Sequence, residues 1–308
     1  MKMKKIYTLL ALTITFSMNA QVSTNSTSTT GTYASAMGNG TTASGNESTA
    51  MGYDTTASGE ASTAMGYSTT ASAQGSTAMG KLTTASHQAS TAMGQSTTAS
   101  AAFTTAIGYN TTASGSYSTA MGRYTTASGF TSTAMGWSTT ASDYSSTVIG
   151  QYNSSGSSAT SADSFSTSAP AFVIGNGTSG SLSDAFKVMF NGDTTVSNDL
   201  TVSGDVVISS DVRLKSNIVS LGSTLPKLLQ IDGKSYEMKG KQKIGVLAQE
   251  IKEVFPELVS EDDNEMLAVN YQGLVPVLIN ALKEQESKII NQQSQIDELK
   301  VLVNKLIN

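Results

Sequence analysis

The sequence contains no cysteine, a single histidine and few charged residues. Without cysteine, the 308-residue chain has no disulfide framework, no thiolate metal site and no cysteine nucleophile. Its one histidine, His87, excludes metal sites built on a histidine pair and disfavours a Ser-His-Asp triad. Charged residues make up 13% of the chain, against roughly 25% in a typical globular protein, and the net charge is −5. This balance argues against nucleic acid as the main partner, and we expect neither a cofactor nor a metal.

Charge is unevenly distributed along the chain. Residues 21–209 carry nine acidic and three basic side chains and are rich in Ser, Thr, Gly and Ala. Residues 210–308 carry fourteen acidic and twelve basic side chains, which is an ordinary globular composition. The shift predicts two different kinds of structure that join near residue 210.

The N-terminus has the pattern of an export signal. Three lysines among the first five residues precede the apolar stretch 6–18, which is too short to span a bilayer. Ala20 then meets the polar Gln21, so we expect a signal peptide at residues 1–20. An N-terminal membrane anchor is the alternative. No later segment is apolar enough to cross a membrane, so we expect the mature chain at the cell surface or outside the cell, without a transmembrane anchor.

Internal repeats dominate the first part of the chain. Residues 41–152 form eight tandem units of fourteen residues, from TTASGNESTAMGYD at 41–54 to TTASDYSSTVIGQY at 139–152. No residue is inserted or lost, and the preceding segment 21–40 ends in a partial unit at 31–40. Fourteen residues are too few for a two-helix repeat but suit two short strands and two turns. The repeats therefore predict parallel coils of a β-solenoid from about 31 to 152.

Strand alternation orients the side chains of each coil. Ser48 and Ala50 fall on one face of the strand, and Thr49 and Met51 on the other. A glycine follows in every coil, as Gly52 does in the first, which fits a turn with positive φ or a close approach of two backbones. We expect a coil core of Met and Ala. Because that core is thin, coil stacking and packing against other chains must supply the rest of the burial.

The repeats resemble the head repeats of trimeric autotransporter adhesins, which read roughly Ser-aliphatic-Ala-Ile-Gly followed by Ala-x-Gly-x-x-Ser. The matching residues are 48–52, Ser-Thr-Ala-Met-Gly, and 57–62, Ala-Ser-Gly-Glu-Ala-Ser. The resemblance covers about 31–152 and implies a left-handed parallel β-roll assembled as a homotrimer. Thr replaces the usual Val or Ile, and Met mostly replaces Ile. The family's C-terminal membrane β-barrel has no counterpart, so we do not expect a complete autotransporter.

The residue after the glycine of each unit varies, and so do the residues between TTAS and STAMG, while the scaffold around them repeats. We expect these variable side chains to be exposed, either as an aromatic ladder that contacts a glycan or another surface, or as tolerated turn variation. The residues that follow the glycine in the eight units are Tyr53, Tyr67, Lys81, Gln95, Tyr109, Arg123, Trp137 and Gln151.

Residues 153–209 leave the repeat. Short apolar or alternating runs lie at 171–174, 186–190, 200–202 and 206–208, and glycines separate them. These runs predict an irregular β stalk, also trimeric.

Residues 210–308 contain two motifs in which we look for candidate catalytic residues. Residues 210–218 read Ser-Asp-Val-Arg-Leu-Lys-Ser-Asn-Ile, and residues 245–250 read Gly-Val-Leu-Ala-Gln-Glu. Alone, the first motif also suits a capped helix start with Ser210 or Asp211 as N-cap. Together the motifs resemble the self-cleaving C-terminal intramolecular chaperone of endosialidase tailspikes, whose signature is Ser-Asp-x-Arg-x-Lys-x-x-Ile followed by Gly-x-x-Ala-Gln-Glu. Every specified position is matched, and the resemblance covers about 209–308.

The resemblance implies a Ser-Lys dyad in which Ser210 is the nucleophile and Lys215 the base. By the resemblance, Ser210 attacks the carbonyl of Ser209 and the chain is cut between these two residues, as a single-turnover serine endopeptidase without other substrates. A lysine can act as the base only where burial or nearby positive charge lowers its pKa, and the arginine of the motif could contribute that charge. Ser209 is a competing nucleophile by chemistry alone. Positioning roles are expected for Asp211, Arg213 and Asn217.

A heptad pattern follows Tyr271. It predicts a long helix with a coiled coil at about 278–307, in which two glutamine layers reduce stability. The a positions are Leu282, Ile289, Ile296 and Val303, and the d positions are Leu278, Gln285, Gln292, Leu299 and Leu306. The expected fold class is a mainly β N-terminal region and stalk, followed by a small α+β domain that ends in this coiled-coil helix.

These patterns predict an exported homotrimeric, adhesin-like surface fibre that is assembled by a C-terminal chaperone, which then cuts itself off. Identical, nearly uncharged coils can pair one unit out of register. A trimeric C-terminal domain would fix the register first, and cleavage would then trap the fibre kinetically. The alternatives are a phage-type tail-fibre component, an ice-binding solenoid that uses the aligned ladder of Thr41, Thr55 and Thr69, and a structural spacer without a ligand.

Overall fold

The computed structural model describes residues 25–262 and 265–307. The expected signal peptide at residues 1–20 lies outside these described residues. The chain forms two compact units, with the boundary between Gly204 and Asp205. None of the helices in the described ranges is both long enough and apolar enough to cross a membrane.

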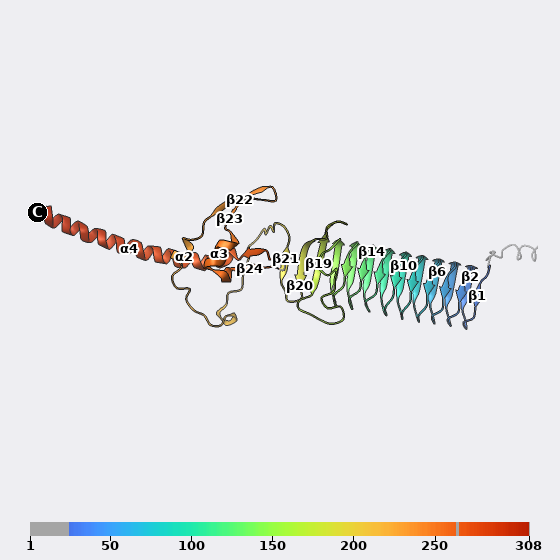
Figure 1. Cartoon of the computed structure of the whole chain (residues 1–308). Coiled ribbons are helices and arrows are strands. Elements are labelled where there is room, and N and C mark those ends of the chain that lie inside the picture. The colour runs from blue at the N-terminus through green and yellow to red at the C-terminus, as the bar shows by residue number, and fades with distance from the viewer. Residues whose placement is uncertain (1–24, 263–264, 308) are drawn as a thin grey trace, which may run out of the picture. The chain divides into compact units, whose positions relative to one another are not determined.

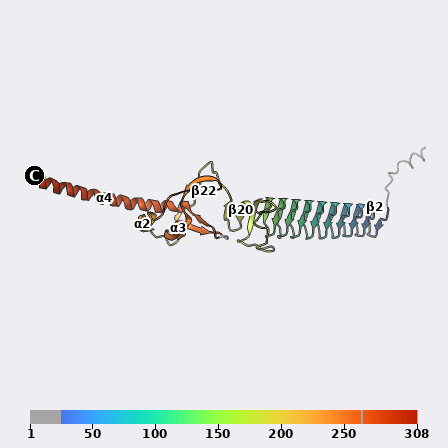
Figure 2. The ribbon, with the colours of Figure 1, turned by 45° about the horizontal axis from the view of Figure 1, so that its top comes forward.

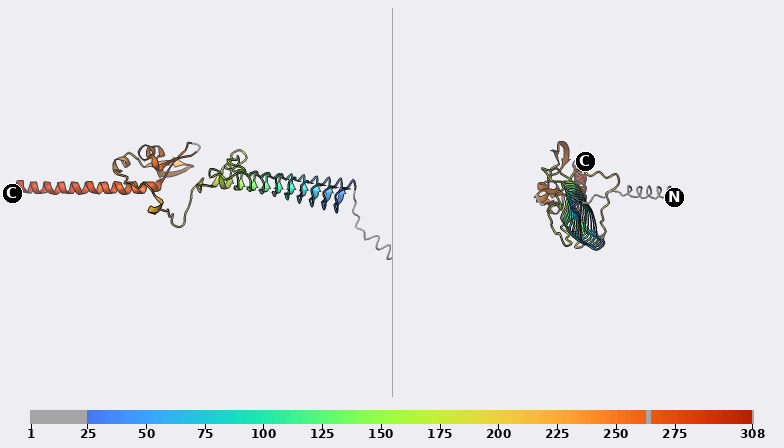
Figure 3. Two further views of the ribbon diagram at one scale, coloured as in Figure 1. Left: turned by 90° about the horizontal axis from the view of Figure 1, so that it is seen from below. Right: turned by 90° about the vertical axis from the view of Figure 1, so that its right-hand side faces the viewer.

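The first unit is a β-solenoid in which each coil contributes one five-residue strand and one two-residue strand (Figure 1). Successive coils pair in parallel, and each residue lies beside its equivalent fourteen positions later, as Thr49 lies beside Thr63. Figure 2 shows the regular spacing of the coils, and the right-hand view of Figure 3 shows them overlying one another along the stack. The predicted parallel coils are confirmed, and they begin slightly earlier than expected, at Ser28.

The long strands belong to a twelve-stranded sheet and the short strands form a nine-stranded sheet. The long strands are β2 (Ser35–Asn39), β4 (Thr49–Tyr53), β6 (Thr63–Tyr67), β8 (Thr77–Lys81), β10 (Thr91–Gln95), β12 (Thr105–Tyr109), β14 (Thr119–Arg123), β16 (Thr133–Trp137) and β18 (Thr147–Gln151). The short strands are β1 (Ser28–Thr29), β3 (Thr42–Ala43), β5 (Thr56–Ala57), β7 (Thr70–Ala71), β9 (Thr84–Ala85), β11 (Thr98–Ala99), β13 (Thr112–Ala113), β15 (Thr126–Ala127) and β17 (Thr140–Ala141).

Small side chains fill the interior between the two sheets. In the first full coil, Ala43 and Ala50 have no exposed surface, and neither do Thr41 and Ser48. The predicted grouping of Ser48 with Ala50 is therefore right, and theirs is the interior face. Met51 lies half-buried on the outer face. The expected Met and Ala core is thus wrong in its methionine, because the interior is filled by Ala, Ser and Thr, with Val148 and Val173 at its C-terminal end.

The turns of each coil depend on unusual backbone conformations. Glu47 and Asp54 lie in the left-handed region, with φ 59° and 54°. Gly52 has φ 124°, and a Cβ built on it would lie 2.0 Å from the carbonyl oxygen of Gly66. Consecutive backbones therefore touch at this position, and only glycine fits there.

Side chains cap the last fourteen-residue coil where a further coil would otherwise pair. The Asn153 side chain accepts a hydrogen bond from the Thr140 N–H at 2.8 Å and donates one to the Thr140 carbonyl at 2.9 Å. Asp143 Oδ1 accepts from the backbone N–H groups of Thr160 and Ser161, at 2.6 and 2.7 Å. The Asn153 bonds satisfy backbone groups of Thr140 that a further coil would have satisfied, and the Asp143 bonds tie the following loop to the last coil.

Three strands extend the larger sheet beyond the repeats. β19 (Pro170–Asn176) pairs in parallel with β18, and β20 (Asp184–Met189) and β21 (Thr194–Val196) continue the sheet in antiparallel order. The runs predicted at 171–174 and 186–190 therefore form strands. The strands predicted at 200–202 and 206–208 are wrong for the single chain, because these runs find no neighbouring strand and an unpaired strand is unstable.

The second unit is a small α+β domain that continues into a helix of 34 residues. Its elements are η1 (Val212–Leu214), α2 (Leu225–Leu228), β22 (Lys234–Met238), β23 (Lys241–Gly245), α3 (Ala248–Val254), η2 (Pro256–Leu258), β24 (Val259–Glu261), β25 (Leu267–Val269), η3 (Tyr271–Gly273) and α4 (Leu274–Ile307). Ile251, Phe255 and Val277 form its core and join α3 to the start of α4. The expected fold class, a β-solenoid followed by a small α+β part with a long terminal helix, is confirmed.

Candidate functional site

Ser210 and Lys215 lie side by side at the start of the second unit. Asp211 caps η1 by accepting a hydrogen bond from the Arg213 N–H at 2.8 Å. This turn brings Lys215 Nζ to 2.6 Å from Ser210 Oγ. The cap predicted for the motif is therefore present, on a short turn with Asp211 as N-cap, and the same turn places the serine beside the lysine.

Asp211 holds the side chain of Arg213. Arg213 Nε lies 3.0 Å from Asp211 Oδ1 and Nη2 lies 2.7 Å from Oδ2. The hydrogen bonds from Arg213, first from its side chain and then from its backbone, lower the pKa of Asp211, and the same pairing raises the pKa of Arg213. Because the carboxylate compensates the guanidinium, Arg213 is poorly suited to the expected role of supplying positive charge to Lys215. The positioning roles of Asp211 and Arg213 stay predictions.

The dyad is aligned but open to solvent. Ser209, Ser210 and Lys215 are all exposed. A lysine ammonium donates in such a contact, whereas a general base must accept, and burial favours the neutral amine. Asn217 has φ 52°, so its contribution is a change in backbone direction two residues after Lys215. The nucleophile role of Ser210 and the base role of Lys215 stay predictions.

A carboxylate on α4 holds the segment that follows the dyad, and the sequence analysis missed it. Glu284 Oε2 accepts from Ser223 Oγ at 2.7 Å, and Oε1 accepts from the backbone N–H groups of Thr224 and Leu225. These bonds, led by the one from Thr224, lower the pKa of Glu284. Thr224 Oγ1 also donates to the Val277 carbonyl at 3.0 Å. No sequence pattern links a glutamate to a serine 61 residues earlier, so only the fold reveals this clasp.

The second motif builds the domain rather than the dyad. Glu250 Oε1 lies 3.4 Å from Lys234 Nζ, and Oε2 accepts from the Asp232 N–H at 3.3 Å, which ties α3 to the start of β22. Gln249 and Tyr271 line a small pocket between β22, β25 and α3. The Gly-x-x-Ala-Gln-Glu segment is therefore a structural element that shapes the domain.

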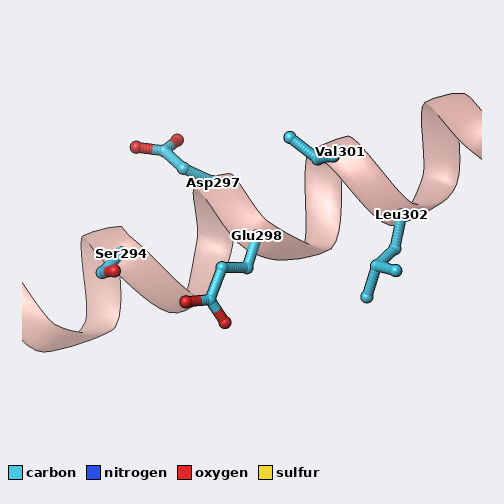
Figure 4. A pocket seen from close by; sticks show the side chains of 5 residues that line it. All are labelled: Ser294, Asp297, Glu298, Val301 and Leu302. Atoms are coloured by element: carbon cyan, nitrogen blue, oxygen red, sulfur yellow. The ribbon is translucent and has the colours of Figure 1, made fainter.

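The predicted long helix is present, and most of its apolar side chains are uncovered in the single chain. Leu282, Ile289 and Leu299 are 66%, 50% and 60% exposed. A shallow hollow further along α4 is lined by Ser294, Asp297, Glu298, Val301 and Leu302. Figure 4 shows Asp297 and Val301 on one side of the helix and Glu298 and Leu302 on the other, so the hollow is open space between side chains rather than a ligand cavity.

Exposed aromatic side chains line both turns of the solenoid. The variable position after the glycine is exposed in every unit except the last, whose Gln151 is half-buried, so the predicted exposure is confirmed. The rings of Tyr53 and Tyr67 stack at this turn with centroids 5.1 Å apart. At the opposite turn, Phe103 and Tyr117 stack at 5.0 Å. The two turns thus carry most of the chemical variety of the repeats.

The threonine ladder on which the ice-binding alternative depends lies inside the solenoid. Thr41, Thr55 and Thr69 are aligned as expected, but they have no exposed surface. A buried ladder cannot contact ice, so this ladder does not support the ice-binding alternative.

Comparison with protein families identifies both parts of the chain. The YadA head domain repeat matches residues 30–55, 57–83, 85–111, 103–125 and 127–153. The Peptidase_S74 family, the chaperone of endosialidase, matches residues 210–260. None of the curated proteins compared with the chain matches it significantly. The chain therefore combines YadA head repeats over residues 30–153 with an endosialidase chaperone domain over residues 210–260.

Proposed function

We propose that the chain is the subunit of an exported homotrimeric surface fibre whose C-terminal domain assembles the trimer and then cuts the chain between Ser209 and Ser210. The observation that carries the proposal is the 2.6 Å contact between Lys215 Nζ and Ser210 Oγ. That contact lies in the segment that matches the chaperone of endosialidase. Both matched families support a trimeric protein of adhesin-like or tail-fibre-like type.

The cleavage is an acyl transfer within the chain. Ser210 Oγ gives its proton to the neutral amine of Lys215 and attacks the carbonyl carbon of Ser209. The C–N bond between Ser209 and Ser210 breaks, the Ser210 nitrogen takes up the proton, and the acyl group of Ser209 stays as an ester on Ser210 Oγ. One water then hydrolyses this ester to the Ser209 carboxylate and the Ser210 hydroxyl. The reaction has a single turnover because the nucleophile leaves with the C-terminal fragment.

Assembly supplies the shielding that the dyad lacks in one chain. Apolar side chains surround the cleavage site without cover, including Val207 at 87%, Val212 at 66% and Leu214 at 72% exposure. Association of three chains would bury such side chains, because removing apolar surface from water is favourable. The same burial would exclude water from Lys215 and favour its neutral form. Cleavage then follows trimerisation rather than preceding it.

Two surfaces support association of the chains. On the outer face of the larger sheet, Thr49, Met51 and their equivalents form two uncharged columns, each residue beside its equivalent in the next coil. These side chains are mostly half-buried in one chain and gain burial when chains pack. The exposed heptad residues of α4, such as Ile289, supply a coiled-coil contact. Since the columns repeat every coil, the C-terminal contact is the one that sets the register.

Substitution of the dyad tests the proposal. We expect Ser210→Ala to remove the nucleophile and Lys215→Ala to remove the base, so that both chains stay full length on a denaturing gel while light scattering still gives a trimer. The matched control is Ser209→Ala, which removes the neighbouring hydroxyl and leaves the dyad intact, and which we expect to be cut normally. Cleavage of Ser210→Ala at the same bond would overturn the proposed mechanism.

A tail-fibre-like component is the second candidate function, and the chaperone match is the observation that favours it. Antibodies to the β-solenoid head would distinguish a surface fibre from a tail-fibre component. Labelling of intact producing cells supports a surface fibre, whereas labelling confined to phage particles supports a tail fibre.

A further inference from the structure

A cluster on one turn of the solenoid combines a lone cation with three aromatic rings. The Arg123 Cζ lies 5.6 Å from the Tyr109 ring centroid, 5.1 Å from that of Tyr124 and 5.6 Å from that of Trp137. The side chains come from three consecutive coils, because Arg123 lies beside Tyr109 on one side and beside Trp137 on the other. Cation–π contacts of this kind hold a guanidinium in place. The name Arg123 cluster is used below for Arg123, Tyr109, Tyr124 and Trp137.

The charge of Arg123 is not compensated. Arg123 is the only charged residue in the three coils at 97–138. No ion pair found among the described residues joins it to a carboxylate. Arg123 is also exposed. A guanidinium fixed by rings and free of an anion presents its donors to a carboxylate from outside, in the bidentate geometry that arginine favours.

The rings of the Arg123 cluster are arranged differently from the stacked pairs elsewhere in the solenoid. Parallel pairs occur on both turns, with interplanar angles of 6° between Tyr53 and Tyr67 and 8° between Phe103 and Tyr117, so those ring faces cover one another. In the Arg123 cluster, Tyr109 and Tyr124 meet at 88°. Crossed rings leave part of their faces uncovered, and Tyr109 and Trp137 are 40% and 43% exposed. The cluster therefore offers both apolar ring surface and hydrogen-bond donors.

We infer that the Arg123 cluster binds a glycan that carries a carboxylate, such as a sialylated or uronic-acid-containing sugar. The C–H faces of a sugar ring pack on aromatic rings, and the guanidinium pairs with the acid group. A single cation in an otherwise uncharged surface matches one carboxylate per site, whereas an acidic peptide with several charges favours a basic patch. Three copies in a trimer would add avidity. The inference deepens the proposed function by naming the ligand class of the head, and it rests on that function only in taking the head as the outward-facing part of a fibre.

The sequence provides a fluorescent probe of the Arg123 cluster and a matched control substitution. Trp137 is the single tryptophan of the sequence, so intrinsic tryptophan fluorescence reports on the cluster alone. Lys81 occupies the same position of the repeat, three coils earlier, with its Nζ 5.8 Å from the Tyr67 ring. It lies beside Gln95 where Arg123 lies beside Trp137. Lys81→Gln therefore removes a cation of the head without touching the cluster.

The test is a fluorescence titration of the full-length Ser210→Ala chain with sialyllactose, with lactose and with a polyglutamate peptide. We expect sialyllactose to change the Trp137 emission saturably and with weaker affinity at high salt. Arg123→Gln should weaken its binding at least about tenfold, and Lys81→Gln should leave it unchanged. The inference is overturned if sialyllactose causes no change, if lactose or polyglutamate binds as well, or if Arg123→Gln binds like the parent. Light scattering on the same sample and gel analysis of the unsubstituted chain report separately on trimerisation and cleavage, so failure of the proposed function is distinguished from failure of this site.

Discussion

At the scale of single residues, the close contact between coils decides which side chains the repeat can carry. The glycine near the end of each long strand lies against the backbone of the next coil. The turn before each long strand tolerates more variety, since its left-handed position is occupied by Ala61, Gly75, Ala89 and even Phe103 in different coils. Both positions have positive φ, but only the glycine position meets the backbone of the next coil, and the following substitution tests this steric difference.

Gly94→Ala should destabilise the solenoid strongly. Gly94 has φ 119°, and a Cβ there would lie 2.0 Å from the Gly108 carbonyl oxygen. We expect a loss of at least about 2 kcal/mol in the free energy of unfolding, measured by denaturant titration. Gly75→Ala is the control, because its φ is 64° and its nearest neighbour, the Ala89 Cα, is 4.0 Å away. Equal losses for the two variants would contradict the steric explanation.

Thr83→Val should stabilise the solenoid. The hydroxyl of Thr83 is buried and has no hydrogen-bond partner among the described residues, as in seven equivalent coils. Valine fills the same space without a buried polar group, so we expect a gain of about 1 kcal/mol in thermal unfolding experiments. Thr84→Val, at the half-buried neighbouring position on the outer face, should have little effect. A lower melting temperature for Thr83→Val would show that the hydroxyl has an unrecognised partner.

Much of this residue-level detail lies beyond the reach of sequence reasoning. Alternation predicts correctly that Ser48 and Ala50 share a face, because strand geometry is local. It does not tell which face lies inside, since that depends on how the two sheets pack, and Met51 lies half-buried on the outer face. The spacing of Ser210 and Lys215 within one motif predicts their proximity, and one turn suffices to bring them within 2.6 Å.

At the scale of elements, a strand or helix is stable only where a neighbouring element packs or pairs with it. The repeats fold into coils because every coil has a neighbour of the same sequence. The apolar runs 200–202 and 206–208 have strand-like sequences but no partner in the chain, and they form no strand. The clasp of Glu284 on Ser223 and Thr224 is a long-range contact of the kind that no local pattern reveals. Local periodicity is therefore predictable, whereas pairing across the fold is not.

The Glu284 clasp should make the C-terminal domain sensitive to acid. The pKa of Glu284 is lowered from its ordinary 4.5 by hydrogen bonds that the carboxylate accepts. A carboxyl group with a lowered folded-state pKa stabilises the fold above its unfolded-state pKa, and this contribution is lost as the pH falls through the folded-state value. We expect the melting temperature of the parent to exceed that of Glu284→Gln at neutral pH, and the difference to vanish in acid. Melting curves between about pH 3 and about pH 7 measure it, and a difference that is independent of pH would argue against the clasp.

At the scale of the whole molecule, the two units carry different tasks that the proposed function connects. The head consists of coils that are almost interchangeable, so its own contacts distinguish poorly between correct register and a slip of one coil. The C-terminal unit has a unique sequence, an uncovered heptad helix and the Ser210–Lys215 contact. In the proposed function, the C-terminal unit sets the register of the three chains. Its removal by cleavage then traps the assembled fibre kinetically.

The most direct test of this account is the intact mass of the products from the expressed wild-type chain, taken after light scattering has established the trimer. The account predicts a C-terminal fragment with the mass of residues 210–308 and an N-terminal product that ends at Ser209. A trimer whose chains remain uncut, or a fragment that begins at a residue other than Ser210, would contradict it.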